Sequence, residues 1–228
     1  ILDKIKSIKT VLVVNYPGKK YLKQKKIKGT RFYQLKKINK IKYEEIKFKR
    51  FDFDHELAIL YSSGTTGKPK CICHRSGGVL LQHLKEHKLH CEVKPGDNVF
   101  YFTTCGWMMW NWLLTFLASK ASIVLFDGFP MYKKDDLLLK IANDEKITLF
   151  GVSAKYIDQL RKKNIYIKSK FKLNKLKIIC STGSPLSGDN FQYVYDSIKK
   201  NVHLASIAGG TDLVSCFVLG NIYSPVYK

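Results

Sequence analysis

The chain has 228 residues, of which 45% are hydrophobic and 13% aromatic, and its 40 Lys and Arg against 18 Asp and Glu give a formal net charge of +22. This apolar content is enough to build a core and excludes a wholly disordered protein. The longest apolar stretch, residues 106–118, is shorter than the roughly 20 residues of a membrane span, so we expect no such span. The first residue is Ile1, which favours a piece of a longer protein.

The first 50 residues carry +14 of the total charge of +22. A basic block can bind nucleic acid through phosphate contacts. However, 36 of the 40 cations are lysine, whereas nucleic-acid readers favour arginine. We interpret this block as a solvated lysine-rich region, with a buried strand over residues 8–14 and a long loop or weak surface structure over residues 19–50. We therefore expect no nucleic-acid partner. The alternative is that the first 50 residues bind nucleic acid, with an affinity that falls steeply as the salt concentration rises.

From residue 51 onward, apolar runs of strand length alternate with amphipathic stretches of helix length. Strands are predicted over residues 57–61, 98–103, 121–126, 147–152, 176–181 and 202–207, with a short one over 214–219. Helices are predicted over residues 76–91, 107–119, 133–145, 154–163 and 188–199. This alternation predicts an α/β fold with mostly parallel sheets flanked by helices, whose ligand-binding loops lie at the carboxyl ends of the strands.

The six cysteines do not have the spacing of a disulfide framework, so we expect a reducing, cytoplasmic setting. Cys71, Cys73 and His74 raise the alternative of a zinc site with the histidines downstream. That alternative lacks the C-x2-C pair of closed zinc sites, and Cys71 and Cys73 would share one face of a strand.

The most informative segment is the loop Ser62–Lys70, in which four hydroxyl residues, two glycines and two lysines follow a predicted strand. Glycines let a backbone approach an anion closely, and N–H groups, hydroxyls and lysines bind phosphate oxygens. It is not a Walker A loop, because two residues separate Gly64 from Gly67 and Pro69 follows Lys68. The segment predicts a phosphate-binding loop; a Gly/Ser/Thr-rich hairpin linker is the alternative.

The loop resembles the phosphate-binding signature of the acyl-adenylate-forming (AMP-binding) enzymes. Further segments resemble the acetoacetate-activating members of that family, namely Phe53–His55, Gly106–Trp112, Ser181–Leu186 and Gly209–Phe217. The resemblance implies an ATP-dependent acid–CoA ligase for acetoacetate or a similar short acid. It acts through an acyl-adenylate, with ATP and coenzyme A as co-substrates and Mg²⁺ bound. The alternatives are an acetyl-CoA or other short-chain acyl-CoA synthetase, and a non-catalytic basic fragment.

The resemblance also implies roles for individual residues. The catalytic residues would be Lys68, Thr211 and Asp212, with Asp212 binding Mg²⁺, and Trp107 and Met108 would border a pocket for a small acid. Alternatively, residues 107–112 form a core helix. His74 could touch substrate or cap local structure. The nucleotide-binding set would be Ser62, Ser63, Gly64, Thr65, Thr66, Gly67, Lys68, Lys70, Gly183, Ser184, Pro185, Gly209, Gly210 and Thr211.

The resemblance runs from about Tyr43 to Lys228, and the regular alternation of strands and helices begins at Phe51. Residues 51–228 would be part of the large N-terminal adenylation domain of such a ligase, and residues 1–50 a lysine-rich strand plus loop. The family's ribose-binding aspartate, its hinge and its C-terminal lid domain have no counterpart here. We therefore expect a fragment that does not complete turnover by itself.

Overall fold

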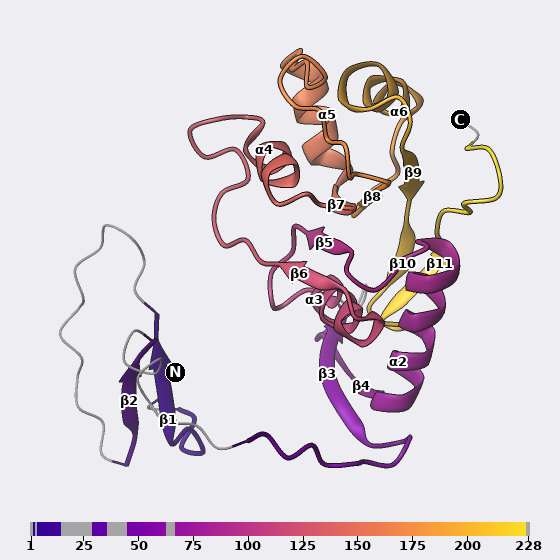
Figure 1. Cartoon of the computed structure of the whole chain (residues 1–228). Coiled ribbons are helices and arrows are strands. Elements are labelled where there is room, and N and C mark those ends of the chain that lie inside the picture. Colours follow the sequence, from indigo (N-terminus) through magenta and orange to yellow (C-terminus); the bar gives the residue numbers. More distant parts are fainter. Residues whose placement is uncertain (1, 3, 15–28, 36–44, 63–66, 227–228) are drawn as a thin grey trace. The chain divides into compact units, whose positions relative to one another are not determined.

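A computed structural model describes residues 2, 4–14, 29–35, 45–62 and 67–226 of the chain (Figure 1). The chain divides into two compact units, residues 1–50 and residues 51–228. Among the described residues, no helix has both the length and the apolar character that crossing a membrane requires.

In the first unit, strands β1 (Thr10–Val13) and β2 (Arg31–Gln34) pair in parallel, with Thr10 opposite Arg31. The strand predicted over residues 8–14 is present as β1. The prediction that it is buried was wrong, because its residues alternate between exposed and half-buried. A sheet of two strands is too small to bury its own residues. Strand β2 fits the alternative of weak surface structure over residues 19–50 and rules out a loop at residues 31–34; residues 19–28 and 36–44 lie outside the described residues.

The second unit is built on a five-stranded, fully parallel sheet in the order β6-β5-β7-β8-β9. This confirms the predicted α/β fold and the predicted strands over residues 98–103, 121–126, 147–152, 176–181 and 202–207, each of which is slightly shorter in the structure. The strands are β5 (Asn98–Tyr101), β6 (Ser122–Val124), β7 (Leu149–Ser153), β8 (Ile178–Thr182) and β9 (His203–Ser206).

Helices cover both faces of this sheet (Figure 1). Two helices continue into π-helical turns, α2 (Ser76–Lys85) into η1 (Glu86–His90) and α6 (Gly188–Tyr193) into η3 (Val194–Ile198). The other helical segments are α3 (Met108–Leu114) with the 3₁₀ segment η2 (Thr115–Ser119), α4 (Leu137–Asp144) and α5 (Ala154–Lys162). All five predicted helices are present; four keep their predicted bounds to within one residue, and the fifth shows a larger difference.

That difference concerns the helix predicted over residues 133–145, which begins only at Leu137. Asp136 occupies the N-cap position, but its side chain does not cap the helix. Its carboxylate instead pairs with Lys170 at 2.6 Å, and Asp135 pairs with Lys163 at 2.5 Å. The carboxylates that precede this helix thus form tertiary ion pairs and not a local cap.

The core consists of one apolar cluster on each face of the sheet. Successive strand residues point to opposite faces. Phe100 and Phe150 accordingly belong to the cluster under α4, α5 and α6, whereas their neighbours Val99 and Leu149 belong to the cluster under α2 and α3. All four side chains are at most 2% exposed. The sheet is thus buried on both faces, as parallel sheets require.

Two hairpins complete this unit. Strands β3 (Glu56–Ser62) and β4 (Lys70–Arg75) pair antiparallel and are joined by the predicted phosphate-binding loop, Ser62–Lys70. Strands β10 (Ala208–Gly210) and β11 (Ser215–Val218) form the second hairpin directly after β9. The strands over residues 57–61 and 214–219 are confirmed, whereas β10 was not predicted, because three small residues carry no apolar period.

Candidate active site

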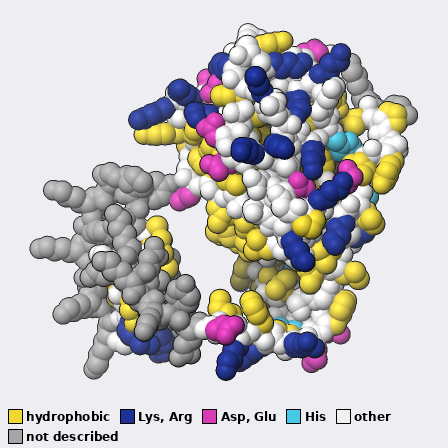
Figure 2. Space-filling view, in the orientation of Figure 1, with side chains coloured by type: hydrophobic (Ala, Val, Ile, Leu, Met, Phe, Trp, Pro, Cys, Tyr) yellow, Lys and Arg dark blue, Asp and Glu magenta, His cyan; other side chains and the backbone are white. Residues whose placement is uncertain are grey.

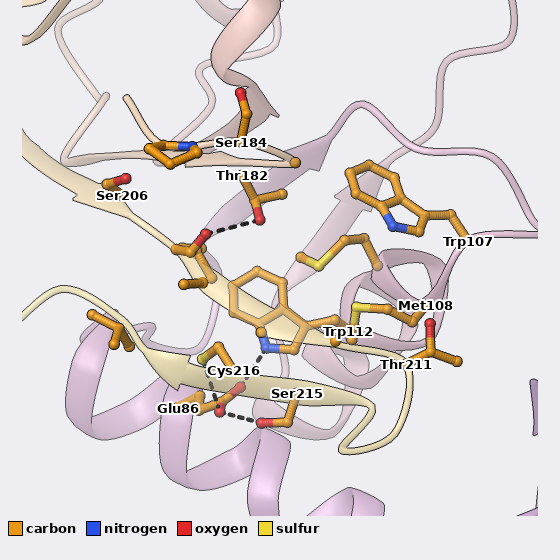
Figure 3. A pocket seen from close by; sticks show the side chains of 18 residues that line it. Glu86, Trp107, Met108, Trp112, Thr182, Ser184, Ser206, Thr211, Ser215 and Cys216 are labelled. Carbon is orange, nitrogen blue, oxygen red and sulfur yellow. Dashed lines mark hydrogen bonds between the residues drawn. The ribbon is translucent and has the colours of Figure 1, made fainter. Parts of the chain in front are cut away.

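A cavity of about 530 Å³ lies where strands β8 and β9 end (Figure 3). It is lined by many of the residues predicted to bind nucleotide or acid, namely Trp107, Met108, Gly183, Ser184, Pro185, Gly209, Gly210 and Thr211. The carboxyl ends of parallel strands place ligand-binding loops together. Residues that are far apart in the sequence are therefore brought to one cavity.

The segment Gly183–Pro185 leaves β8 in a backbone conformation that suits glycine. Gly183 has a φ of 89°, in the left-handed region that residues with a Cβ disfavour. Just before it, the hydroxyl of Thr182 donates to the carbonyl oxygen of Ile207 at 3.0 Å. This bond joins the ends of β8 and β9 and fixes the edge of the cavity.

The hairpin β10–β11 forms another wall and depends on Gly209. A Cβ at this position would lie 2.2 Å from the carbonyl oxygen of Ser215 and 2.5 Å from the Cα of Cys216. At the turn, the Nε2–H of His74 donates to the carbonyl oxygen of Thr211 at 2.8 Å. His74 therefore contacts the backbone of Thr211. This contact fits the alternative in which His74 caps local structure.

The aromatic segment serves both as core and as cavity wall. Met108, Met109 and Trp112 are at most 7% exposed and belong to the core cluster under α2 and α3, yet they also line the cavity. Trp107, at the N-cap of α3, is half-buried and lines it too. The two interpretations of residues 107–112 are thus compatible, because a helix packed on the sheet exposes its first turn to the cavity.

The buried carboxylate of Glu86, which is absent from the predicted site residues, also lines the cavity. Its side chain is 1% exposed and accepts hydrogen bonds from four donors (Figure 3). Oε2 accepts from Trp112 Nε1 at 2.8 Å. Oε1 accepts from Gln82 Nε2 at 2.9 Å, from Cys216 Sγ at 3.1 Å and from the hydroxyl of Ser215.

These donors keep Glu86 ionised. Burial by itself raises the pKa of a carboxyl group, but the hydrogen bonds from Ser215, Cys216 and Trp112 outweigh burial and lower the pKa of Glu86. A signal exists in the sequence, because Val79, His83 and Glu86 recur at helical spacing on one face of the predicted helix. That face is the buried one.

Comparison with known proteins assigns the family. The sequence profile of the AMP-binding enzymes, described as "AMP-binding enzyme", matches residues 2–219. The chain belongs to the AMP-binding enzyme family. This confirms the resemblance drawn from the motifs.

Relatives of this AMP-binding enzyme chain include the acetoacetyl-coenzyme A synthetase of Rhizobium meliloti (strain 1021), 54% identical over 79% of this chain, and the acetoacetyl-CoA synthetase of Gallus gallus, 48% identical over 81%. Each match covers 28% of the relative. The malonamoyl-CoA synthetase vrtB of Penicillium aethiopicum is 43% identical over 76% of the chain and 26% of its own length. The chain thus spans about a quarter of the curated relatives it matches.

A solved structure supports the same assignment. The acetoacetyl-CoA synthetase from Streptomyces lividans has a TM-score of 0.82 to this chain at 35% identity. The match covers 95% of this chain and 33% of that one. The α/β fold described above is therefore that of part of an acyl-CoA synthetase.

Of the phosphate-loop residues that the structure describes, none is part of the cavity lining. Ser63, Gly64, Thr65 and Thr66 are outside the described residues. Of the others, Ser62 is half-buried at the end of β3, and Gly67, Lys68 and Lys70 are exposed before or at the start of β4. Because a strand follows the loop, it does not open a helix, as the sequence predicted.

Asp212 is likewise outside the cavity lining. It is exposed in the turn between β10 and β11, next to Thr211, which does line the cavity. In the described ranges, no ion pair involves Asp212. A carboxylate in this position is available to an external cation.

The histidines of the zinc alternative serve packing instead. His83 is fully buried, with Nδ1 2.9 Å from Thr115 Oγ1 and Nε2 2.5 Å from the carbonyl oxygen of Val214. Within the described part of the chain, no three His, Cys, Asp or Glu side chains lie together in a way that could hold a metal ion. Cys71 and Cys73 are both exposed on β4.

His87 is fully buried, and neither of its ring nitrogens has a hydrogen-bond partner among the described residues. Its ring stacks on Phe116, with 3.5 Å between the ring centroids, and meets Trp112 edge-on. Burial, with a smaller contribution from His83, lowers the pKa of His87 from 6.5 to about 2. The imidazole is therefore neutral in the folded protein.

We predict that this histidine makes folding sensitive to acid. Below pH 6.5 the unfolded chain binds a proton at His87 that the folded chain does not, so the free energy of unfolding falls as the pH falls. His87→Phe keeps the ring stack and should reduce this slope by up to about 1.4 kcal/mol per pH unit. Urea unfolding over a pH series measures it. His55→Phe, at an exposed position, is the control, and equal slopes in His87→Phe and the parent would contradict the prediction.

Proposed function

We propose that this chain carries the nucleotide and acid sites of an ATP-dependent acid–CoA ligase that activates acetoacetate or a similar short acid. The observation that carries the proposal is the cavity itself. It joins the segment Gly183–Pro185, the hairpin residue Thr211 and the aromatic wall that begins at Trp107. The names of the relatives point to the same chemistry.

The proposed reaction has two steps. The carboxylate of the acid attacks the α-phosphate of ATP and releases pyrophosphate, and the thiol of coenzyme A then attacks the acyl carbonyl and releases AMP. Because the substrate carboxylate is the nucleophile, the protein needs to supply positioning and charge stabilisation. We assign binding of the β- and γ-phosphates to the loop Ser62–Lys70, with Lys68 as its mobile cation. The segment Gly183–Pro185 would lie along the adenine, and Gly209, Gly210 and Thr211 beside the α-phosphate.

Asp212 fits the Mg²⁺ that the family implies. Its exposed carboxylate and the neighbouring Thr211 hydroxyl are oxygen donors, the ligand type that Mg²⁺ prefers. When bound, the ion would neutralise charge on the phosphates. The part of this chain is to hold that ion with Asp212 and to place the Thr211 hydroxyl at the cavity.

The cavity favours a short acid. Its wall of Trp107, Met108, Met109 and Trp112 is large and apolar and packed on the sheet, which limits the length of chain that can enter. The acids in the relatives' names, acetoacetate and malonamate, are of this size. An acetyl-CoA or other short-chain acyl-CoA synthetase is the second candidate, because the same wall would accept acetate.

The setting that we propose is the cytoplasm. All six cysteines lie in the described part of the chain and are free thiols, as a reducing compartment favours. Lysines and arginines on the face seen in Figure 2 are scattered among acidic and other side chains. For the described residues of this face, their scatter supports solvated positions.

The experiment uses the protein encoded by the complete open reading frame that contains this sequence. Pyrophosphate release is measured with ATP, coenzyme A and acetoacetate, acetate or butyrate. We expect the highest kcat/KM with acetoacetate. Release that is fastest with acetate would favour the second candidate, and no release with any short acid would leave the non-catalytic interpretation.

A further inference from the structure

Glu86 gives the cavity a fixed negative charge. Among the described residues that line the cavity, it is the only one with a charged side chain. Four hydrogen-bond donors surround its carboxylate, and within the described residues no lysine or arginine pairs with it. The nearby His83 is itself buried, which lowers its pKa and disfavours a positive charge there. The charge of Glu86 is therefore not neutralised locally.

The position of this charge is fixed by three separate elements. Glu86 begins η1, Trp112 belongs to α3, and Ser215 and Cys216 belong to β11. Their side chains converge at one end of the cavity, whereas Thr211 and Ser184 lie on other parts of its lining (Figure 3). A carboxylate held from three elements cannot rotate away from a ligand.

We infer that Glu86 is a specificity-determining residue, which excludes acids with a second negative charge from the cavity and turns the single carboxylate of an accepted acid towards Thr211. This inference rests on the proposed function and deepens it. The accepted class would be short acids whose far end is uncharged, such as a ketone or an amide. Dicarboxylates of the same size would be rejected.

The physical reason is like-charge repulsion in a cavity with apolar walls. At an effective dielectric constant of about 20, two like charges roughly 8 Å apart disfavour binding by about 30-fold. An acid with one carboxylate escapes this penalty when its charged end lies away from Glu86. A dicarboxylate cannot escape it, because one of its two charges must face Glu86.

The test compares three acids with the same number of non-hydrogen atoms: acetoacetate, malonamate and malonate. Pyrophosphate release is measured in the complete open-reading-frame product. In the parent protein we expect kcat/KM for malonate to be about 30-fold below that for malonamate. Equal use of malonate and malonamate by the parent would overturn the inference but not the proposed function. Absence of release with all three acids would overturn both.

The decisive variant is Glu86→Gln, which removes the charge at nearly constant size. Its amide oxygen can accept from Trp112 Nε1, and its amide nitrogen can donate to Ser215 Oγ. We expect the malonate-to-malonamate ratio of kcat/KM to rise at least about tenfold, as the repulsion is removed. The matched control is Glu92→Gln, which removes an exposed carboxylate that pairs with Lys94 outside the cavity and should leave the ratio unchanged.

An unchanged ratio in a folded, acetoacetate-active Glu86→Gln protein would contradict the inference. If that variant does not fold, the parent protein still provides a test. Lowering the pH protonates the second carboxyl group of malonate, so the malonate-to-malonamate ratio should rise by a similar factor. A flat ratio across that titration would overturn the inference.

Discussion

Replacing Asp212 by Asn should lower kcat for acid activation by roughly 100-fold, the loss expected when one group that stabilises transition-state charge is removed. Asp212 is exposed and makes no ion pair within the described part of the chain, so the substitution should leave folding intact. The loss should be partly recovered at high Mg²⁺ concentration, because a weakened ion site fills by mass action. Pyrophosphate release with ATP and acetoacetate, measured over a Mg²⁺ series, checks this.

The matched control is Asp196→Asn. Asp196 is also exposed, but it lies on η3, where it accepts a hydrogen bond from Gln192, and it is not part of the cavity lining. It should leave kcat and its Mg²⁺ dependence unchanged. If Asp212→Asn retained full activity at low Mg²⁺, the assignment of Asp212 to the metal would be wrong.

Replacing Gly209 by Ala should destabilise the hairpin β10–β11 by about 2 kcal/mol, within the range for overpacking a site that has no space. The added methyl group would lie 2.2 Å from the carbonyl oxygen of Ser215 and 2.5 Å from the Cα of Cys216. Both are backbone atoms, so no side-chain rotation can relieve the contact. The strands must separate, which would also move the donors Ser215 and Cys216 away from Glu86. The free energy of unfolding, measured with a chemical denaturant, and the rate of acetoacetate activation should therefore both fall.

The neighbouring residue provides the control for stability. A Cβ on Gly210 would have no other atom within 4 Å, so Gly210→Ala should unfold at nearly the same denaturant concentration as the parent. Equal stability of the two alanine variants would show that the hairpin can open at Gly209 without cost, and would contradict the packing argument.

Local patterns determined most of the fold. The strand over residues 147–152 and the helix over 154–163 follow from an apolar run and from helical spacing, and both formed close to the predicted bounds. Ser187, directly before the helix predicted over residues 188–199, caps α6, because its side chain accepts from the backbone N–H of Asn190 at 3.4 Å. The predicted start of α4 was wrong, since the helix begins at Leu137. Asp136, just before it, pairs with Lys170, a residue distant in sequence that no local pattern contains.

The candidate site divides in the same way. The family motifs identified Gly183–Pro185, Thr211 and Trp107, because phosphate and nucleotide binding impose short, recognisable residue patterns. Glu86 was not identified, because a glutamate on a helix is an ordinary surface residue unless tertiary contacts bury it. Its four donors come from α2, α3 and β11, so its environment exists only after these elements have packed.

The sequence by itself thus determined the family and the α/β alternation, and its motifs predicted the site residues, since these depend on local spacing and residue type. Tertiary structure decided which of the predicted site residues line one cavity, and among the described residues it gave that cavity a single buried charge. The reason is physical: the ionisation of Glu86 depends on the balance between loss of water and hydrogen bonds from distant segments. That balance is a property of packing, which no local pattern encodes.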